Sequence, residues 1–220
     1  MHEREGMFSD LPIFSRSWRR RRRQERRFAL GLPEMTRAET GLLRRQIQGA
    51  GTMVEFGSGT STFFALSCGV GRLVSVESDP AWLARLREDP RCAEEEASGR
   101  LMLLHADIGR VRDRGYPIND RRKDIGTTYA SAPWPVCDHR ADVVLVDGRF
   151  RVACALTAAL ESGAGTMILI HDYSNRPFYH VIEDHLPMVT QSGRLAVFES
   201  RLNEVELARK AAAVYLADPR

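Results

Sequence analysis

No stretch of this sequence holds the roughly eighteen consecutive apolar residues that a transmembrane helix requires. The charges near the N-terminus are not followed by the apolar segment of a secretory signal, so we expect a cytoplasmic protein. Cysteine is scarce: the four residues lie far apart and form no Cys-x-x-Cys pair, which argues against a disulfide framework or a zinc site. They are Cys68, Cys92, Cys137 and Cys154. A chain of 220 residues, 43% of them hydrophobic, suits one buried core better than two.

Positive charge is concentrated near one end of the chain. Residues 16–27 hold eight Arg and one acid, Glu25, which gives this segment +7, whereas the whole chain carries +3 and the remainder therefore −4. Attraction to nucleic acid or to an anionic membrane would come from this segment, since the body offers no broad basic surface. We interpret residues 1–34 as an arginine-rich arm and residues 35–220 as the folded domain. A merely solvated arm is the simpler interpretation, because no RNA-binding motif follows it.

From residue 36 on, short apolar segments alternate with amphipathic ones. Thr36 and Glu39 have the spacing of a capping box, which predicts a helix over 36–49. The alternation then predicts strands at 52–56, 72–77, 101–105, 142–147 and 166–171 with two more within 187–200, and helices at 60–69, 80–88, 150–161, 176–186 and 203–216. Strands this apolar indicate a parallel sheet covered on both faces. We predict a Rossmann-like, doubly wound α/β fold whose seven-stranded, mostly parallel sheet ends in an antiparallel C-terminal hairpin.

A glycine-rich turn joins the first predicted strand to the following helix. Gly57 and Gly59 allow the backbone to pass close beneath a ligand, and the exposed N–H groups of the helix favour an anionic or polar group. A dinucleotide fingerprint would place a third glycine where Thr62 stands, and a phosphate-binding loop would need a Gly-Lys-Ser/Thr sequence that is absent. Glu77 closes the next strand, where a carboxylate can accept both hydroxyl hydrogens of a ribose.

These residues resemble the first motif of the class I S-adenosylmethionine-dependent methyltransferases, acid-x-Gly-x-Gly-x-Ser, which is matched by Glu55, Gly57, Gly59 and Ser61. The resemblance extends over residues 36–200. It implies S-adenosylmethionine as the cofactor, with the methionine part against Glu55 and the turn Phe56-Gly57-Ser58-Gly59, and the ribose on Glu77. Asp107 would accept the adenine amino group and Ile108 would offer its backbone N–H.

The ends of the fourth and fifth parallel strands would overhang the methyl group in this topology. Asp147, His171 or Asp172 can accept the proton that a methyl acceptor releases, and these three are our candidate catalytic residues. We expect the substrate to be a small molecule that is methylated on oxygen or nitrogen. An anionic group on it would be bound by arginines, and the candidate substrate-binding residues are Arg149, Arg151, Tyr173 and Arg176.

A magnesium ion is not expected, although two protein oxygens plus water and substrate would suit one. Small catechol-type O-methyltransferases hold magnesium with an acid after strand four and an Asp-Asn pair after strand five. This chain departs from that pattern, because it shows Asp147 and then His171-Asp172.

The stretch 107–139 contains several Pro and Gly residues and has no clear period, which favours a functional loop. We expect part of a lid here, with Tyr116, Tyr129 and Trp134 contacting substrate. Two alternative functions stay open: an oxidoreductase that binds NAD or another nucleotide, and a catalytically silent scaffold that binds nucleic acid or membrane through residues 16–27. The sequence does not define an oligomeric state.

Overall fold

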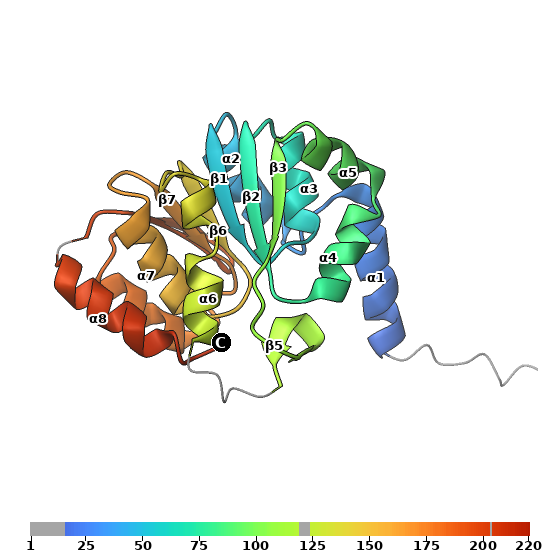
Figure 1. Cartoon of the computed structure of the whole chain (residues 1–220). Helices are drawn as coiled ribbons and strands as arrows, with labels where there is room; N and C mark the ends of the chain where they lie inside the picture. Colours follow the sequence, from blue (N-terminus) through green and yellow to red (C-terminus); the bar gives the residue numbers. More distant parts are fainter. Residues whose placement is uncertain (1–15, 119–123, 203) are drawn as a thin grey trace, which may run out of the picture.

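The computed structural model of the chain describes residues 16–118, 124–202 and 204–220, and the side chains from residue 22 on. A seven-stranded sheet forms its centre (Figure 1), with the strand order β3-β2-β1-β6-β7-β9-β8. Its strands are β1 (Thr52–Phe56), β2 (Arg72–Glu77), β3 (Leu101–His105), β6 (Val143–Val146), β7 (Met167–Ile170), β8 (Met188–Ser192) and β9 (Leu195–Glu199). The first five of these are parallel, whereas β9 runs antiparallel to both β7 and β8. The predicted Rossmann-like fold with its C-terminal hairpin is confirmed.

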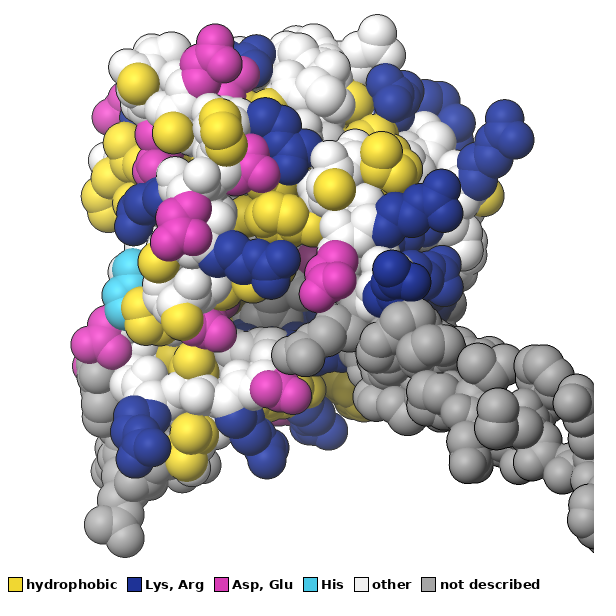
Figure 2. All heavy atoms as spheres, turned by 90° about the vertical axis from the view of Figure 1, so that its right-hand side faces the viewer, with side chains coloured by type: hydrophobic (Ala, Val, Ile, Leu, Met, Phe, Trp, Pro, Cys, Tyr) yellow, Lys and Arg dark blue, Asp and Glu magenta, His cyan; other side chains and the backbone are white. Residues whose placement is uncertain are grey.

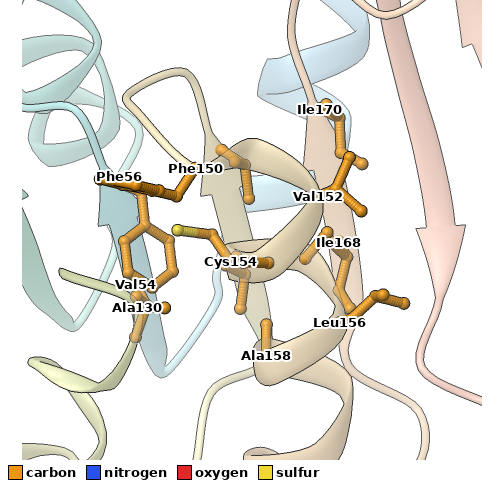
Figure 3. Packing of buried hydrophobic residues seen from close by; sticks show 14 of the residues in the cluster. Val54, Phe56, Ala130, Phe150, Val152, Cys154, Leu156, Ala158, Ile168 and Ile170 are labelled. Atoms are coloured by element: carbon orange, nitrogen blue, oxygen red, sulfur yellow. The ribbon is translucent and has the colours of Figure 1, made fainter. Parts of the chain in front are cut away.

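Helices cover both faces of the sheet, as expected for strands that are apolar on both sides. One face packs against α2 (Arg37–Ile47), α3 (Thr60–Ser67), α4 (Pro80–Arg87) and α5 (Pro90–Ala97). The other packs against α6 (Ile125–Ser131), α7 (Arg151–Glu161) and α8 (Val205–Tyr215), with the 3-10 helices η2 (Trp134–Val136) and η3 (Pro177–Asp184). Alternate residues of one strand therefore enter different cores: Val54 and Phe56 lie in the second, as Figure 3 shows, while Met53 lies in the first.

The arginine-rich segment forms a helix, α1 (Arg16–Leu30), whose C-terminal part is packed on the domain. The Phe28 ring lies 5.2 Å from that of Phe63 and 5.8 Å from that of Trp82, and Arg91 donates hydrogen bonds to the carbonyls of Phe28 and Ala29. Figure 2 looks onto this side of the molecule and shows Arg and Lys side chains gathered along the right of the face. The boundary between an arm and a domain at residue 34 stays a prediction.

Three sequence-based expectations about the elements are corrected. Helix α5 was not expected, although Asp89 caps it as Asp79 caps α4, each immediately before a proline. The segment 176–186 forms the 3-10 helix η3 rather than an α-helix. The presumed loop 107–139 holds α6, η2, the two-stranded pair β4 (Val111–Arg112) and β5 (Tyr116–Pro117), and the 3-10 turn η1 (Asp113–Gly115) between them.

None of the helices in the described residues is both long enough and apolar enough to span a lipid bilayer.

Candidate functional site

The site lies where the turns that follow β1 and β6 meet. Gly57 has φ of 96°, in the left-handed region that favours glycine, and a Cβ there would come within 2.7 Å of the Gly148 backbone. The strand order runs outward in opposite directions from β1 and β6, so this contact marks the topological switch point of the sheet. Ligands of doubly wound folds bind in the crevice at such a point.

Glu55 supports the glycine turn from below. Its Oε2 accepts hydrogen bonds of 2.6 Å from the hydroxyls of Ser75 and Thr62, and the Thr62 hydroxyl in turn accepts one from the Gly59 N–H. Burial raises the pKa of Glu55 to about 7, against the opposing effect of hydroxyl donors that include Ser61. Its Oε1 is buried without a hydrogen-bond partner in the described part of the chain. The residue that replaces the third glycine of a dinucleotide fingerprint, Thr62, thus holds the turn in place.

Two other residues expected at the cofactor, Phe56 and Ser58, have their side chains engaged within the protein. The Phe56 ring faces the core, 5.8 Å from the Tyr129 ring, so this residue has only its backbone near the turn. The Ser58 hydroxyl lies 2.7 Å from the Ser75 hydroxyl, and the Ser58 carbonyl accepts a hydrogen bond from the Trp82 indole N–H. Both residues fix the shape of the turn, and their contact with a cofactor stays a prediction.

Glu77 ends β2 with one carboxylate oxygen already bound. Its Oε1 accepts hydrogen bonds from the N–H groups of Ser78 and Asp79, at 2.6 and 2.9 Å, and from the Ser78 hydroxyl. Burial raises the pKa of Glu77, and these donors offset part of that rise. Among the residues that the structure describes, every hydrogen-bond donor to Glu77 binds Oε1, which leaves Oε2 to accept from a ligand such as a ribose. This arrangement fits the role that the sequence predicts for Glu77.

Asp107 and Ile108 follow β3. Asp107 is exposed, and its Oδ1 accepts a 2.9 Å hydrogen bond from the Gly109 N–H. The Ile108 side chain is buried in the core. The structure therefore places Asp107 at the same end of the sheet as Glu77, while its contact with adenine stays a prediction.

The ends of β6 and β7 bring Asp147 and His171 together. His171 Nδ1 lies 3.1 Å from Asp147 Oδ1, and the geometry assigns the proton to Nδ1. Burial opposes a charge on Asp147, but His171 and Arg151 outweigh it and lower the pKa of Asp147 to about 2. Burial also opposes a charge on His171, and Asp147 outweighs it, so the pKa of His171 is raised above its ordinary value. The remaining nitrogen, Nε2, is buried and has no partner among the described residues.

Asp172 is surrounded by arginines. It accepts a 2.7 Å hydrogen bond from Arg176 and another from Arg194, and Arg151 Nη1 lies 3.7 Å away. The residue has φ of 58°, a left-handed conformation that Asp and Asn tolerate better than most residues. The three predicted catalytic residues therefore form one cluster, in which Asp172 neutralises cations and its role in proton transfer stays a prediction.

Two predicted substrate-binding residues, Arg151 and Tyr173, are buried and bonded within the protein, and their contact with a substrate stays a prediction. Arg151 is 2% exposed, and its three side-chain nitrogens donate to the carbonyls of Gly148, His171 and Asp147 and to the Asp147 carboxylate. It fastens the end of β6 to that of β7, so each of its side-chain nitrogens is already engaged within the protein. Tyr173 is 1% exposed in the core, and its hydroxyl donates to Glu183. Arg176 remains partly exposed, and its substrate contact stays a prediction.

Of the three aromatic residues of the expected lid, two are buried in the core and one is half-buried. Tyr129 and Trp134 are each 1% exposed and belong to the core beneath α7, so the expectation that they contact substrate from a lid is wrong. Tyr116 is half-buried on β5, and the guanidinium of Arg149 lies 4.0 Å over its ring. Of the three, only Tyr116 lies at the crevice.

The cluster does not fit a magnesium ion. One ligand atom from each of Asp147, His171 and Asp172 lies within 4.8 Å of the others. Magnesium takes nearly all its ligands from oxygen and keeps several waters. Both carboxylates are already bound to guanidinium groups, and the third member is an imidazole. The guanidinium groups of Arg151, Arg176 and Arg194 supply the positive charge that a metal ion would supply in a metal site.

Sequence reasoning missed two residues of this network, Arg194 and Glu39. Arg194 Nη1 reaches Asp172 from the turn between β8 and β9, and the Arg194 N–H donates a 2.7 Å hydrogen bond to the buried Glu39 carboxylate on α2. Glu39 was identified only as part of a capping box. Its burial opposes ionisation, but backbone donors at Thr36 and Arg194 lower the pKa of Glu39. No local sequence signal joins residues this far apart.

A cavity lies beside this network, against α1. The cavity, of about 330 Å³, is lined by Arg23, Gln24, Arg27, Glu34, Met35 and Arg194. Three arginines and a single acidic residue are among the residues that line it. Whether residues 16–27 bind nucleic acid or an anionic membrane stays a prediction.

Comparison with solved structures shows what this chain is similar to. A methyltransferase-like protein from Silicibacter pomeroyi is 32% identical, with 85% of this chain and 97% of that chain covered at a TM-score of 0.72. An S-adenosylhomocysteine-bound methyltransferase from Podospora anserina is 12% identical, with 90% of this chain and 100% of that chain covered at 0.54. A methyltransferase from Geobacter sulfurreducens is 15% identical, with 87% and 93% covered at 0.51. The latter two show the fold alone.

No protein-family model and no curated protein sequence matches the chain. The first similarity is sufficient for assignment, because it combines 32% identity with nearly complete coverage of the other chain. The fold and the crevice define an α/β enzyme of the methyltransferase class. The chain belongs to the class I S-adenosylmethionine-dependent methyltransferase family.

Proposed function

We propose that this enzyme transfers the methyl group of S-adenosylmethionine to an oxygen or nitrogen atom of a small molecule. The observation that carries the proposal is the contact between Gly57 and Gly148. It joins a turn and carboxylate suited to a nucleoside, Gly57–Gly59 and Glu77, to the His171–Asp147 pair in one crevice. A structure neighbour, the Podospora anserina methyltransferase, contains S-adenosylhomocysteine, which is the product of such a transfer.

The residues present fit that cofactor. Glu77 has one oxygen fixed by the backbone and the other free to accept from sugar hydroxyls, and the turn at Gly57 lets the main chain approach the ligand closely. The cofactor, when bound, supplies an activated methyl group whose departure from the sulfonium needs no help from an acid. The protein's own contribution is to orient the acceptor and to receive its proton.

His171 is the proposed proton acceptor. Its Nδ1–H donates to Asp147, which fixes the ring and leaves the lone pair on Nε2. Because Asp147 raises the pKa of His171 above its ordinary value of about 6.5, the neutral form becomes dominant only above that pH. We therefore expect methyl transfer to rise with pH through a range that lies above 6.5.

The proposal is tested by titration calorimetry with S-adenosylhomocysteine and with NAD. We expect the first to bind and the second to bind at least about 100-fold more weakly, since Thr62 takes the place of the third glycine of a dinucleotide site. Tighter binding of NAD would favour the oxidoreductase alternative. If neither compound binds, the methyltransferase proposal fails.

The pair is tested separately by following the imidazole resonances of His171 by NMR as the pH changes. In the Asp147→Asn variant the burial of His171 would be opposed only by the more weakly acting Asp172, so the pKa of His171 should fall from its value in the wild type. The conservative variant Asp147→Glu serves as the control that retains the charge. An unchanged pKa in Asp147→Asn would show that the two side chains are not coupled.

A further inference from the structure

Arg149 differs from the other buried arginine of the crevice. It follows Gly148 at the end of β6 and is 5% exposed, and its guanidinium lies 4.0 Å over the Tyr116 ring. Its Nε and Nη1 atoms are buried and have no hydrogen-bond partner in the described part of the chain. Arg151 is buried to a similar degree, yet all of its nitrogens are bonded. Arg149 is thus a buried cation with unpaired hydrogen-bond donors.

Such an arrangement is costly in a folded protein. Buried polar atoms nearly always find a partner, and a buried charge is normally paired. The nearby carboxylate of Asp147 accepts no hydrogen bond from Nε or Nη1 of Arg149; its Oδ1 accepts from Arg151 and His171, and the charge of Arg149 contributes to the low pKa of Asp147. The Tyr116 ring offers only its π face. The missing partner is therefore an acceptor from outside the described residues.

The surroundings of Arg149 place that acceptor in the crevice. A Cβ built at Gly115 would lie 3.8 Å from Arg149 Cγ and 3.4 Å from Glu77 Oε1. The stem of Arg149 and the carboxylate of Glu77 thus approach the same point of the chain, next to the Tyr116 ring. Asp147 lies two residues before Arg149, on the side of His171. Arg149 stands between the nucleoside half and the acceptor half of the site.

We propose that Arg149 is the anion receptor of the active site and that it binds a carboxylate of a ligand. The proposal rests on the methyltransferase function given above and specifies the chemistry of its ligands. Two carboxylates can meet the requirement: that of the amino-acid part of the cofactor, or one on the methyl acceptor. Tyr116, stacked on the guanidinium, holds the receptor in place.

The two sources are separated with paired ligands. S-adenosylhomocysteine carries the amino-acid carboxylate, whereas 5′-methylthioadenosine is a thioether nucleoside without it. If the cofactor supplies the carboxylate, Arg149→Gln should weaken S-adenosylhomocysteine by about 10- to 100-fold and change 5′-methylthioadenosine by less than about threefold. If the acceptor supplies it, both nucleosides should bind the variant normally. Benzoate, added to protein saturated with S-adenosylhomocysteine, should then bind the wild type at least about tenfold more tightly than the variant.

The control variant is Arg140→Gln, which removes an equal charge from an exposed position. Arg149→Lys retains the charge and should recover part of the lost affinity, and it replaces Arg149→Gln if that variant does not fold. Equal affinities of wild type and variant for both nucleosides and for benzoate would overturn the proposal. Should the wild type bind neither nucleoside, the methyltransferase function fails. Benzoate binding alone, compared between wild type and variant, then decides the role of Arg149.

Discussion

The carboxylates in the two halves of the crevice have different kinds of partner. On the nucleoside side, Glu55 and Glu77 are held by hydroxyls and backbone N–H groups, and burial raises the pKa of each. On the acceptor side, Asp147 and Asp172 are held by arginines and a histidine, and the pKa of Asp147 is lowered to about 2. The first half is built from neutral donors and the second from paired charges.

Each half nevertheless contains a group that can change its charge near neutral pH. Glu55 has its pKa near 7 and His171 has its own raised above the ordinary value, so one proton-binding group stands on each side of the Gly57–Gly148 contact. Asp147 stays ionised throughout the physiological range. His171 can therefore change its charge beside an Asp147 that stays ionised, which is the property required of a proton acceptor.

The largest expected effect comes from breaking the charge cluster. Asp172→Asn keeps a side chain that tolerates the left-handed backbone but removes the charge that neutralises Arg176 and Arg194. We expect the free energy of unfolding to fall by about 3 kcal/mol or more, because two charge-assisted hydrogen bonds of about 1.5–3 kcal/mol each are weakened and the buried Arg151 loses a negative charge beside it. Glu199→Gln, which disrupts an exposed pair with Arg201, should cost less than about 1 kcal/mol. Denaturant unfolding measures both, and equal losses would contradict the assignment of Asp172 as the centre of the cluster.

The next effect concerns Glu55 and depends on pH. Its pKa is about 7 in the fold and 4.5 ordinarily, so the unfolded chain loses this proton at lower pH and stability falls as the pH rises from 4.5 to 7. Glu55→Gln cannot ionise and escapes this loss. Relative to the wild type, the variant should gain about 3 kcal/mol of unfolding free energy between pH 4.5 and pH 8. A difference that stays constant over this range would show that Glu55 is not the titrating group.

A smaller loss is expected from closing the approach between the two turns. Gly57→Ala places a Cβ against the Gly148 backbone in a residue of positive φ, and should lower the unfolding free energy by about 2 kcal/mol or more. Gly59→Ala is the matched control in the same turn, since nothing lies within 4 Å of its Cβ position. It should cost less than about 1 kcal/mol. Thermal unfolding of the two variants side by side makes the comparison.

The smallest effect expected is that of a metal chelator. Because the arginines already occupy both carboxylates, dialysis against EDTA should change neither the melting temperature nor the affinity for S-adenosylhomocysteine. Addition of magnesium should be equally without effect. A rise in melting temperature with magnesium that is abolished by Asp147→Asn would show that magnesium does bind at Asp147.

The same division explains what could be predicted from the sequence. The nucleoside side is local: Glu55, Gly57 and Thr62 lie within one turn, and strand periodicity located β1, β2 and β3 with little error. The acceptor side is assembled from distant parts of the sequence, since Arg194 bonds both to Asp172 and to Glu39, which lies 155 residues away from it. No periodicity reports such a contact, nor the hydrogen bond from Arg151 to the His171 carbonyl that ties the end of β6 to that of β7.

The remaining errors have local causes. Gly and Pro around Tyr129 and Trp134 look like a loop, although both rings fill the core beneath α7. Helix α5 has a single buried side chain, Cys92, and so shows no apolar stripe. Its Asp89-Pro90 start repeats the Asp79-Pro80 start of α4, and this signal would have revealed it.

The central claim is that the Glu77 carboxylate accepts the sugar hydroxyls of a sulfonium nucleoside or its product. It is measured most directly by calorimetry with S-adenosylhomocysteine and its 2′-deoxy analogue, on the wild type and on Glu77→Ala. The account predicts that the wild type prefers the natural compound by about tenfold or more and that the variant loses this preference. A preference that survives in Glu77→Ala, or a wild type that binds neither compound, would contradict it.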